Sequence, residues 1–348
     1  MFWEKEGKLI YSYDGETVCI EAWGKDALRV RATKNRSFTG RDWALEAKDA
    51  HAGEVEIFED PSAKGGAFAN MYEGTDTSYG KITNGKLHAV IDSGSVITFY
   101  HEDGRVLLKE HFRRLRDEES MPLNIMGREY SNGVGDNFRI VARFVARKGE
   151  KIFGMGQYQQ HELDLKGCML ELAQRNSQVS VPFYLSSIGY GFLWNNPGVG
   201  QVMFANNGTE WVTESGKEID YLVIAGDTPA EIEENYMTLT GKPPMMPEYG
   251  MGFWQCKLRY SNQEQLLSVA RKYKELGVPL DVIVVDFFHW TKQGEFKFDP
   301  KYWPDVPGMC RELKEMGIQV VVSVWPTVDI YSENFEEMKE KGYLVRTE

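Results

Sequence analysis

A single carboxylate, Asp286, follows an apolar stretch and precedes three aromatic residues and a histidine. The stretch at 280–285 ends in four β-branched residues in a row, and helical patterns lie on either side of it. These features are typical of a parallel strand that is buried on both faces. Enzymes built on parallel strands keep their sites at the carboxyl ends of those strands, so Asp286 is a candidate site residue. The alternative is that Asp286 only begins a loop and caps a backbone amide, and the spacing alone favours neither interpretation.

Side chains at two further strand ends would lie at the same edge of the sheet. A carboxylate accepts hydrogen bonds from neighbouring hydroxyl groups, and an aromatic face covers the apolar C–H patch of a pyranose ring. The combination predicts a sugar-binding site around Asp286, with Phe288, Trp290 and Trp325 as further substrate-binding residues. The residues offered by the three strand ends together are Trp254, Gln255, Lys257, Arg259, Asp286, Phe288, His289, Trp290 and Trp325.

Each tryptophan in this set has a purely structural alternative. Core packing is favoured over ligand contact for Trp254, whereas the two interpretations have equal support for Trp290 and Trp325. His289 is expected to be a partly exposed loop histidine. Lys257 and Arg259 fit a surface ion pair as well as they fit a ligand site.

Motifs for other chemistries are missing from the sequence. Gly154-Met155-Gly156 and Gly189-Tyr190-Gly191 do not stand between a strand and a helix, where a phosphate-binding turn would lie. The sequence has no dinucleotide or Walker fingerprint, no serine nucleophile elbow and no zinc-binding His-Glu-x-x-His helix. We therefore expect no cofactor and no metal.

Bulk properties narrow the class of protein. The chain has 348 residues with 42% hydrophobic content, which suits about two globular domains. Its net charge of −12 argues against nucleic acid and anionic membranes as partners, because both attract positive surfaces. The 13% aromatic share suits both a carbohydrate site and a sandwich core.

Four widely spaced cysteines form no metal-binding or CxxC pattern, and we expect them to be free, buried thiols. No apolar segment follows the N-terminus as in a signal peptide, and no apolar run reaches the ~18 residues of a membrane span. These features predict a cytoplasmic protein. The cysteines are Cys19, Cys168, Cys256 and Cys310.

The first 226 residues predict an antiparallel β-sandwich. Asn84-Gly85 and Asp103-Gly104 each separate two alternating segments, which is typical of hairpins with type I′ turns. Residues 41–78 are polar and rich in Gly and Ala, so we expect loops there. Further strands are predicted at 18–21, 28–32, 139–146, 182–185, 191–194, 201–204 and 219–224.

A helix and a proline-rich segment mark a change of domain. Thr228-Pro229-Ala230-Glu231 combines an N-cap hydroxyl, a proline at the first helical position and the glutamate of a capping box. Gly241 ends this helix, and residues 242–247 contain three prolines. We expect a β-sandwich domain at 1–241, a linker at 242–249 and a second domain at 250–348.

Strands and helices alternate in this second domain. Ser261-Asn262-Gln263-Glu264 predicts a capping box at the start of one helix, and further helices are expected near Asp305 and Ser332. The strands are predicted at 250–256, 280–285 and 318–325. Each helix ends with a lysine in its last turn and a glycine suited to a left-handed C-cap. These glycines are Gly277, Gly317 and Gly342.

The number of these units is small. A closed barrel takes eight strands and eight helices, and a shorter series leaves a parallel strand edge uncovered. The sequence predicts three of each. We therefore expect the sequence to be a fragment of a longer protein.

Several motifs, in consistent order from about residue 80 to 345, resemble glycoside hydrolase family 31, which contains α-glucosidases and α-xylosidases. Its α-xylosidase branch is most similar at Trp254-Gln255 with Arg259-Tyr260, at 286–290 and at Ser323-Val324-Trp325-Pro326. The wider set of motifs is Phe153-Gly154-Met155-Gly156-Gln157, Val181-Pro182-Phe183-Tyr184, Gly189-Tyr190-Gly191, Gly252-Phe253-Trp254-Gln255, Asp286, Phe296-Lys297-Phe298-Asp299-Pro300 and Trp303-Pro304-Asp305.

The resemblance implies an N-terminal β-sandwich followed by a (β/α)8 barrel, of which about three βα units are present. It implies retaining hydrolysis of an α-linked sugar at a non-reducing end, without a metal. Asp286 matches the strand-end aspartate that binds sugar hydroxyls in the −1 subsite. Asn176 lies where a sandwich loop reaches over that subsite and replaces an aspartate often found there, which leaves the sugar preference open. The family's nucleophile and acid/base would lie beyond Glu348, so no catalytic residue is expected in this chain.

Two hypotheses about function follow. The first is the N-terminal part of an α-xylosidase or α-glucosidase, inactive as the piece given, with an oligosaccharide or α-glycoside as substrate. The second is a non-catalytic carbohydrate-binding protein in which the sandwich binds the sugar. The sequence leaves the number of subunits open, a homo-oligomer included.

Overall fold

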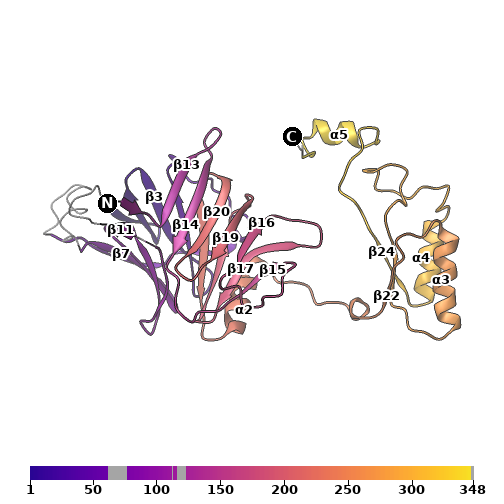
Figure 1. Ribbon diagram of the computed structural model, residues 1–348, viewed down its shortest axis with the longest axis horizontal. Coiled ribbons are helices and arrows are strands. Elements are labelled where there is room, and N and C mark those ends of the chain that lie inside the picture. Colours follow the sequence, from indigo (N-terminus) through magenta and orange to yellow (C-terminus); the bar gives the residue numbers. More distant parts are fainter. Residues whose placement is uncertain (62–76, 112, 116–122, 346–348) are drawn as a thin grey trace. The chain divides into compact units, whose positions relative to one another are not determined.

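The computed structural model describes residues 1–61, 77–111, 113–115 and 123–345 and divides into two compact units. The first unit is Met1–Pro243, and the second is Pro244–Glu348. The first consists almost wholly of antiparallel strands, and the second alternates parallel strands with helices (Figure 1). The fold class expected from the sequence, a β-sandwich domain followed by βα units, is confirmed.

Three large sheets build the first unit. The largest has nine strands in the order β1-β2-β3-β4-β21-β18-β17-β15, with β5 paired to β3. Its strands are β1 Phe2–Lys5, β2 Lys8–Tyr13, β3 Glu16–Trp23, β4 Ala27–Thr33, β5 Ala50–His51, β15 Ile152–Gln157, β17 Val179–Ser186, β18 Tyr190–Trp194 and β21 Ile219–Ala225.

The two other large sheets have five strands each, and one short pair completes the unit. One sheet has the order β10-β9-β8-β7-β6 and the other β13-β14-β20-β19-β16. Their strands are β6 Glu54–Phe58, β7 Tyr79–Asn84, β8 Leu87–Asp92, β9 Ile97–His101, β10 Val106–Lys109, β13 Arg128–Asn132, β14 Phe138–Phe144, β16 Met169–Leu172, β19 Gly200–Phe204 and β20 Thr209–Gly216, and the short pair is β11 Arg113–Leu115 with β12 Leu123–Ile125.

The seven strands predicted from alternation are confirmed as β3, β4, β14, β17, β18, β19 and β21. The expectation of loops throughout 41–78 is wrong in part, because a short 3-10 helix (η1, Ala47–Asp49), β5 and β6 lie there. β6 pairs with β7, and its residues alternate between exposed and half-buried. The alternation of Glu54, Val55, Glu56 and Ile57 is itself a strand signal, which the polar composition of the surrounding segment obscured. Residues 62–76, where loops were also expected, lie outside the described residues.

Both predicted hairpins form, but neither has the expected turn. Asn84 pairs with Leu87 inside the ladder, so the loop is Gly85-Lys86, one residue later than the motif predicts. The reason is tertiary, because the Asn84 amide donates to the carbonyl oxygens of Gly24 and Ala27 at 2.8 and 2.7 Å.

In the second hairpin only Gly104 has a positive φ, 86°, whereas a type I′ turn needs two such residues. The Gly104 N–H donates to the His101 carbonyl at 2.9 Å. This hydrogen bond closes a four-residue turn from His101 to Gly104, and the glycine with the positive φ is its last residue.

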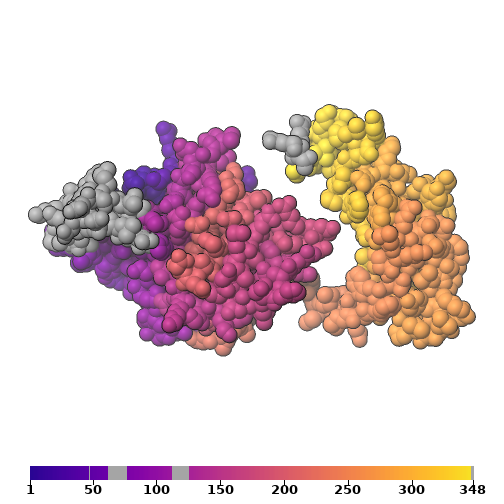
Figure 2. Space-filling model, viewed as in Figure 1, coloured from indigo at the N-terminus to yellow at the C-terminus, as the bar shows by residue number. Residues whose placement is uncertain are grey.

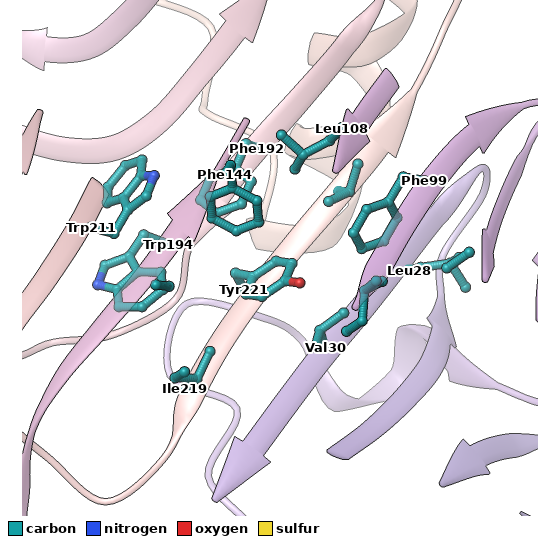
Figure 3. Close-up of a cluster of buried hydrophobic side chains, with 14 of the residues drawn as sticks. Leu28, Val30, Phe99, Leu108, Phe144, Phe192, Trp194, Trp211, Ile219 and Tyr221 are labelled. Atoms are coloured by element: carbon teal, nitrogen blue, oxygen red, sulfur yellow. The ribbon is translucent and has the colours of Figure 1, made fainter. Parts of the chain in front are cut away.

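A stack of aromatic side chains forms the centre of the first unit (Figure 3). The Phe192 ring centroid lies 5.2 Å from those of Trp211 and Tyr221, and the Trp194 and Trp211 rings are 5.6 Å apart. All four of these residues are fully buried. Because burying an aromatic side chain contributes on the order of 2–3 kcal/mol, this core accounts for much of the stability of the sandwich.

The first unit ends with one helix, α2 (Pro229–Thr240), which packs on the nine-stranded sheet. The Thr228 hydroxyl accepts from the Glu231 N–H at 3.2 Å, as the capping motif predicts. The Glu231 carboxylate, however, accepts from the N–H of Asp227 rather than that of Thr228. Tyr236 stacks on Phe183 with the ring centroids 3.8 Å apart, which fixes the helix on the sheet.

The second unit has three parallel strands in the order β22-β23-β24. They are β22 Trp254–Gln255, β23 Val282–Val285 and β24 Gln319–Val322, and the helices are η2 Glu248–Met251, α3 Gln263–Glu275, α4 Val306–Glu315 and α5 Phe335–Glu340. The first strand is much shorter than the predicted 250–256, because the 3-10 helix η2 occupies its expected beginning.

Helices α3 and α4 cover one side of this sheet with a single apolar core. Their atoms pack into one continuous body, orange in Figure 2. Helix α5 buries none of its residues and lies apart from α3 and α4 (Figure 1). The core residues are Tyr260, Leu266, Leu267, Ala270, Leu280, Ile283, Val285, Trp303, Met309, Leu313 and Ile318.

Capping residues limit these helices nearly as the sequence predicts. The cap of α3 is Asn262, not Ser261, because the side-chain Oδ1 of Asn262 accepts from the Gln265 N–H at 2.9 Å. Asp305 caps α4, since its carboxylate accepts from the Gly308 N–H at 2.8 Å. The three helices are followed by glycines with φ of 66°, 77° and 68°, which confirms the predicted left-handed ends; these are Gly277, Gly317 and Gly342.

The four cysteines are free, as predicted, but two of them, Cys256 and Cys310, are exposed rather than buried. Within the described ranges, no helix has the length and apolar character needed to cross a bilayer.

Candidate functional site

Asp286 lies directly after β23, at the carboxyl end of the parallel sheet. Its side chain is half-buried. Carboxylate Oδ1 accepts from the Phe287 backbone N–H at 2.8 Å, so the capping role considered from the sequence is present. The only described donor to Oδ2 is the Cys256 thiol, with sulfur and oxygen 3.7 Å apart. This weak contact leaves Oδ2 free to accept from a ligand hydroxyl.

The structure brings three predicted aromatic residues together beside Asp286. The ring of Phe288 lies 5.9 Å from that of Trp290 and 6.0 Å from that of Trp325, and the two tryptophan rings are 6.2 Å apart. Phe288 is 49% exposed and Trp325 is 42% exposed, so these rings have faces available to a ligand.

Phe288 has a strained backbone. Its φ is 61°, in the left-handed region that a bulky side chain rarely occupies. Such a conformation costs about 1–3 kcal/mol and persists only where surrounding contacts hold it. Here His289 supplies such a contact, because its Nδ1 lies 3.2 Å from the Asp286 carbonyl oxygen.

His289 is buried, so the expectation of a partly exposed loop histidine is wrong. Its ring centroid lies 4.8 Å from those of both Trp290 and Phe298, and these neighbours shield it from water. Desolvation lowers the pKa of His289 below its ordinary value, because the charged form loses its hydration. A neutral His289 braces the loop that carries Asp286 and Phe288.

The end of β22, the first strand of the parallel sheet, carries residues for which the sequence left a structural role and a site role open. Within the described part of the chain, neither Lys257 nor Arg259 forms an ion pair, and the Arg259 guanidinium carbon lies 5.7 Å from the Phe288 ring centroid. Trp254 is 44% exposed, so the favoured assignment to the core is wrong.

Cys256 was not predicted to lie in this cluster. Desolvation, followed by the negative charge of Asp286, raises the pKa of the Cys256 thiol, so the neutral thiol is favoured. The strand register accounts for its position: Gln255 pairs with Ile283 in the parallel ladder, and Cys256 is the next residue along the chain.

Asn176, the remaining predicted site residue, belongs to the first unit and is exposed at the tip of the β16–β17 loop. Arg175 pairs with the Glu171 carboxylate, and Gln174 exchanges hydrogen bonds with the Ser180 backbone at 2.9 and 3.0 Å. These contacts brace the loop. Asn176 lies in a different unit from Asp286, so the structure does not group the two residues.

Two family models match the chain. The Glycosyl hydrolase 31 N-terminal galactose mutarotase-like domain matches residues 17–202, and the Glycosyl hydrolases family 31 TIM-barrel domain matches residues 243–348. The first match alone covers more than half of the 348 residues. The two matches fall on the sandwich unit and on the βα unit that carries Asp286.

Curated relatives and a solved structure agree with these matches. An uncharacterized family 31 glucosidase from Pseudescherichia vulneris is 42% identical over 99% of this chain and 64% of its own length. An alpha-xylosidase of Saccharolobus solfataricus is 36% identical over 60% of this chain and 30% of its own length. An alpha-xylosidase from a soil metagenome, solved with xylose, superposes with a TM-score of 0.86 at 45% identity over 99% of this chain and 50% of that one.

The chain thus spans 64% of the length of the Pseudescherichia vulneris relative and 50% of the chain in the solved structure. Its two units correspond to the sandwich domain and to part of the TIM-barrel domain of the family. The chain belongs to glycoside hydrolase family 31.

Proposed function

We propose that the protein containing this chain is a retaining glycosidase that removes an α-linked sugar, most readily α-xylose, from a non-reducing end. The observation that carries the proposal is the cluster of Asp286 with Phe288, Trp290 and Trp325 at the carboxyl end of the strands. A carboxylate beside aromatic faces matches the hydroxyl groups and the apolar faces of a pyranose. Support for the substrate comes from relatives that are named alpha-xylosidases.

In this proposal Asp286 binds the sugar and does not break the glycosidic bond. Its Oδ2 accepts from a sugar hydroxyl, and this charge-assisted hydrogen bond orients the ring. Phe288 and the tryptophans cover the ring faces and exclude water.

Hydrolysis with retention needs two more groups. A nucleophilic carboxylate and an acid/base carboxylate stand about 5–5.5 Å apart in enzymes of this kind. We assign neither role to a residue of this chain, and we propose that residues 1–348 alone bind sugars but do not hydrolyse them. Turnover of a p-nitrophenyl α-glycoside by the purified chain would contradict this part of the proposal.

Preference for xylose over glucose follows from the aromatic character of the cluster. Glucose differs by an exocyclic hydroxymethyl group, and rings of Phe and Trp offer that hydroxyl almost no hydrogen-bond partners. An unpaired hydroxyl and the crowding of one extra carbon together change transition-state binding by about 1–3 kcal/mol.

The test compares p-nitrophenyl α-xyloside with the matching α-glucoside, using the full-length enzyme. We expect kcat/KM to be at least roughly tenfold higher for the xyloside. An enzyme that prefers the glucoside would overturn the substrate assignment but not the glycosidase. A full-length protein that binds xylose and hydrolyses neither compound would favour the carbohydrate-binding protein instead.

A further inference from the structure

A pocket lies at one end of the sandwich, within the first unit and apart from the Asp286 cluster. It has a volume of about 670 Å³, within the range of small-molecule sites. The segment after β4, the β13–β14 turn, the segment after β18 and the β20–β21 turn form its walls. These elements belong to two different sheets, so the pocket opens where the ends of both sheets meet.

Trp43 presents an aromatic face in this pocket. It is 45% exposed, although tryptophan is highly buried on average. Its φ is 53°, a left-handed conformation that is unfavourable for a bulky residue. The Arg41 guanidinium carbon lies 5.2 Å from the ring centroid and reduces the freedom of the indole.

Buried polar groups fix both chain neighbours of Trp43. Arg29, fully buried, binds the Asp42 carboxylate at 2.7 Å on one side of the tryptophan. Asn195, also buried, accepts from the Ala44 N–H at 3.2 Å on the other side and donates to the Asp42 carbonyl at 3.0 Å. The exposed ring is therefore a rigid platform, which costs little further conformational entropy when a ligand stacks on it.

The network extends beneath the platform to a third element. Asp220 is fully buried and receives Arg29 Nε and Nη2 at 2.9 and 2.7 Å, and Asn195 donates to it at 2.8 Å. Strand β4, strand β21 and the segment after β18 are thereby joined under one exposed residue. An ordinary surface loop does not require three buried polar groups to hold one aromatic side chain outside.

The rim of the pocket offers amide and hydroxyl groups together with charged side chains of both signs, among them Arg36 and Glu218. The amide nitrogen of Asn35 is bonded to the carbonyls of Asp136 and Lys217, which leaves its oxygen as an acceptor. The Lys217 ammonium is paired with the Asp136 carboxylate at 2.7 Å. Further polar lining residues are Ser37, Asn137, Asn196 and Ser215. Donors and acceptors of this kind pair with the adjacent hydroxyl groups of a neutral sugar.

We propose that this pocket is a second sugar-binding site, separate from the Asp286 cluster, in which a neutral pyranose stacks on Trp43. The choice of a sugar among polar ligands rests on the proposed function. An adjoining pocket of about 530 Å³ shares Trp43 and residues 195–198 with the 670 Å³ pocket and extends to Gln174. The shared wall lets an oligosaccharide continue from the platform toward the loop that carries Asn176.

Binding of isomaltotriose to the full-length protein, followed by isothermal titration calorimetry, tests the proposal. Asp286→Asn serves as the background, so that binding at the barrel cluster is weakened. We expect a remaining binding event that becomes at least roughly tenfold weaker in Trp43→Gly, since a stacked aromatic anchor dominates small sites. Glycine accepts the positive φ of position 43, which protects the fold.

Trp3→Ala is the matched control, because Trp3 is 37% exposed and lies outside both pockets. Arg41→Ala, which removes the cation beside the ring, should weaken the same event and serves if Trp43→Gly does not fold. Absence of the remaining event, or equal affinity in Trp43→Gly and Trp3→Ala, overturns the proposal. Because the titration needs no turnover, the two proposals fail separately: a wild-type protein that hydrolyses neither p-nitrophenyl glycoside, while its Asp286→Asn variant still binds through Trp43, would refute the glycosidase and retain the second site.

Discussion

The sandwich unit and the βα unit differ in how far they bury individual strands and tryptophans. Every residue of β21 in the sandwich is buried, whereas no residue of β24 in the βα unit is. Trp194 and Trp211 are fully buried, whereas Trp254 and Trp325 are 44% and 42% exposed. Buried aromatic residues therefore form the centre of the sandwich, whereas in the βα unit, which is part of a TIM-barrel domain, the tryptophans at the first and third strand ends are exposed.

Charged residues differ between the two units in the same way. The sandwich buries the ion pairs Arg29–Asp220 and Arg128–Glu16 between its strands. The βα unit keeps its ion pair between α3 and α4, Arg271–Glu312, at the surface. Buried pairs are costly to break and exposed pairs are not, so matched substitutions in the two units measure the contrast directly.

The largest difference is expected for aromatic truncation. Phe192→Ala removes the ring at the centre of the sandwich core and should lower the free energy of unfolding by about 3–5 kcal/mol. Trp325→Ala removes an exposed ring and should cost less than about 1 kcal/mol. Urea unfolding of both variants measures the two values. Equal losses would show that the aromatic residues of the βα unit are also structural.

Removing one partner of an ion pair should lower the free energy of unfolding by clearly different amounts in the two units. Arg29→Met leaves the Asp220 carboxylate buried without its partner and should cost about 3–5 kcal/mol. Arg271→Met breaks an exposed pair and should cost about 0.2–1 kcal/mol. The same urea titrations give both numbers, and a small loss for Arg29→Met would mean that water reaches Asp220.

Helix caps should matter equally in the two units. Asn262→Ala in α3 and Thr228→Ala in α2 each leave a backbone N–H without its side-chain acceptor, and each should cost about 1 kcal/mol. Hydrogen-exchange mass spectrometry of the two helices locates each loss. A loss spread over the whole chain, rather than confined to the helix concerned, would contradict the division into separate units.

The smallest effect concerns acid pH. The folded state lowers the pKa of His289, so the unfolded chain binds a proton more readily below about pH 6.5. The stabilisation from neutral His289 is complete above that pH and is lost as the pH falls toward the lower pKa of the folded state. The protection of the Val282–Val285 amides, taken relative to their intrinsic exchange rate at each pH, should therefore fall on acidification in the wild type and less so in His289→Gln. Identical pH profiles would remove His289 as the cause.

Much of the fold could be predicted from the sequence because local patterns were strong. Alternation located seven sandwich strands and two hairpins but not β1, β2, β6 or β13, and the run into Asp286 located the central parallel strand. The turn at Gly85-Lys86 was misplaced by one residue, because the tertiary hydrogen bonds of Asn84, which no local pattern contains, decide it. The cap at Asn262 was also misplaced by one residue, although its hydrogen bond to the Gln265 N–H is local. Burial of His289 likewise depends on Phe298, nine positions away.

The sequence predicted those site residues that lie at or just after the end of a predicted strand. Asp286, Phe288, Trp290 and Trp325 gather because parallel strands end at one edge of the sheet. Cys256 and the exposed position of Trp254 depend on the register and length of β22, which η2 shortens. The Trp43 platform gave no signal in the sequence, because its anchors, Arg29 and Asn195, lie far from it along the chain.

The most direct measurement is the effect of Asp286→Asn on kcat/KM for p-nitrophenyl α-xyloside in the full-length enzyme. Loss of a charge-assisted hydrogen bond to the sugar should cost at least about 2 kcal/mol, or roughly thirtyfold, with an unchanged unfolding curve. The control is Asp281→Asn, at the opposite end of the same strand segment, where the carboxylate accepts from the Phe253 N–H. This control should affect stability more than catalysis. An unchanged kcat/KM in Asp286→Asn would remove Asp286 from the site and contradict the account.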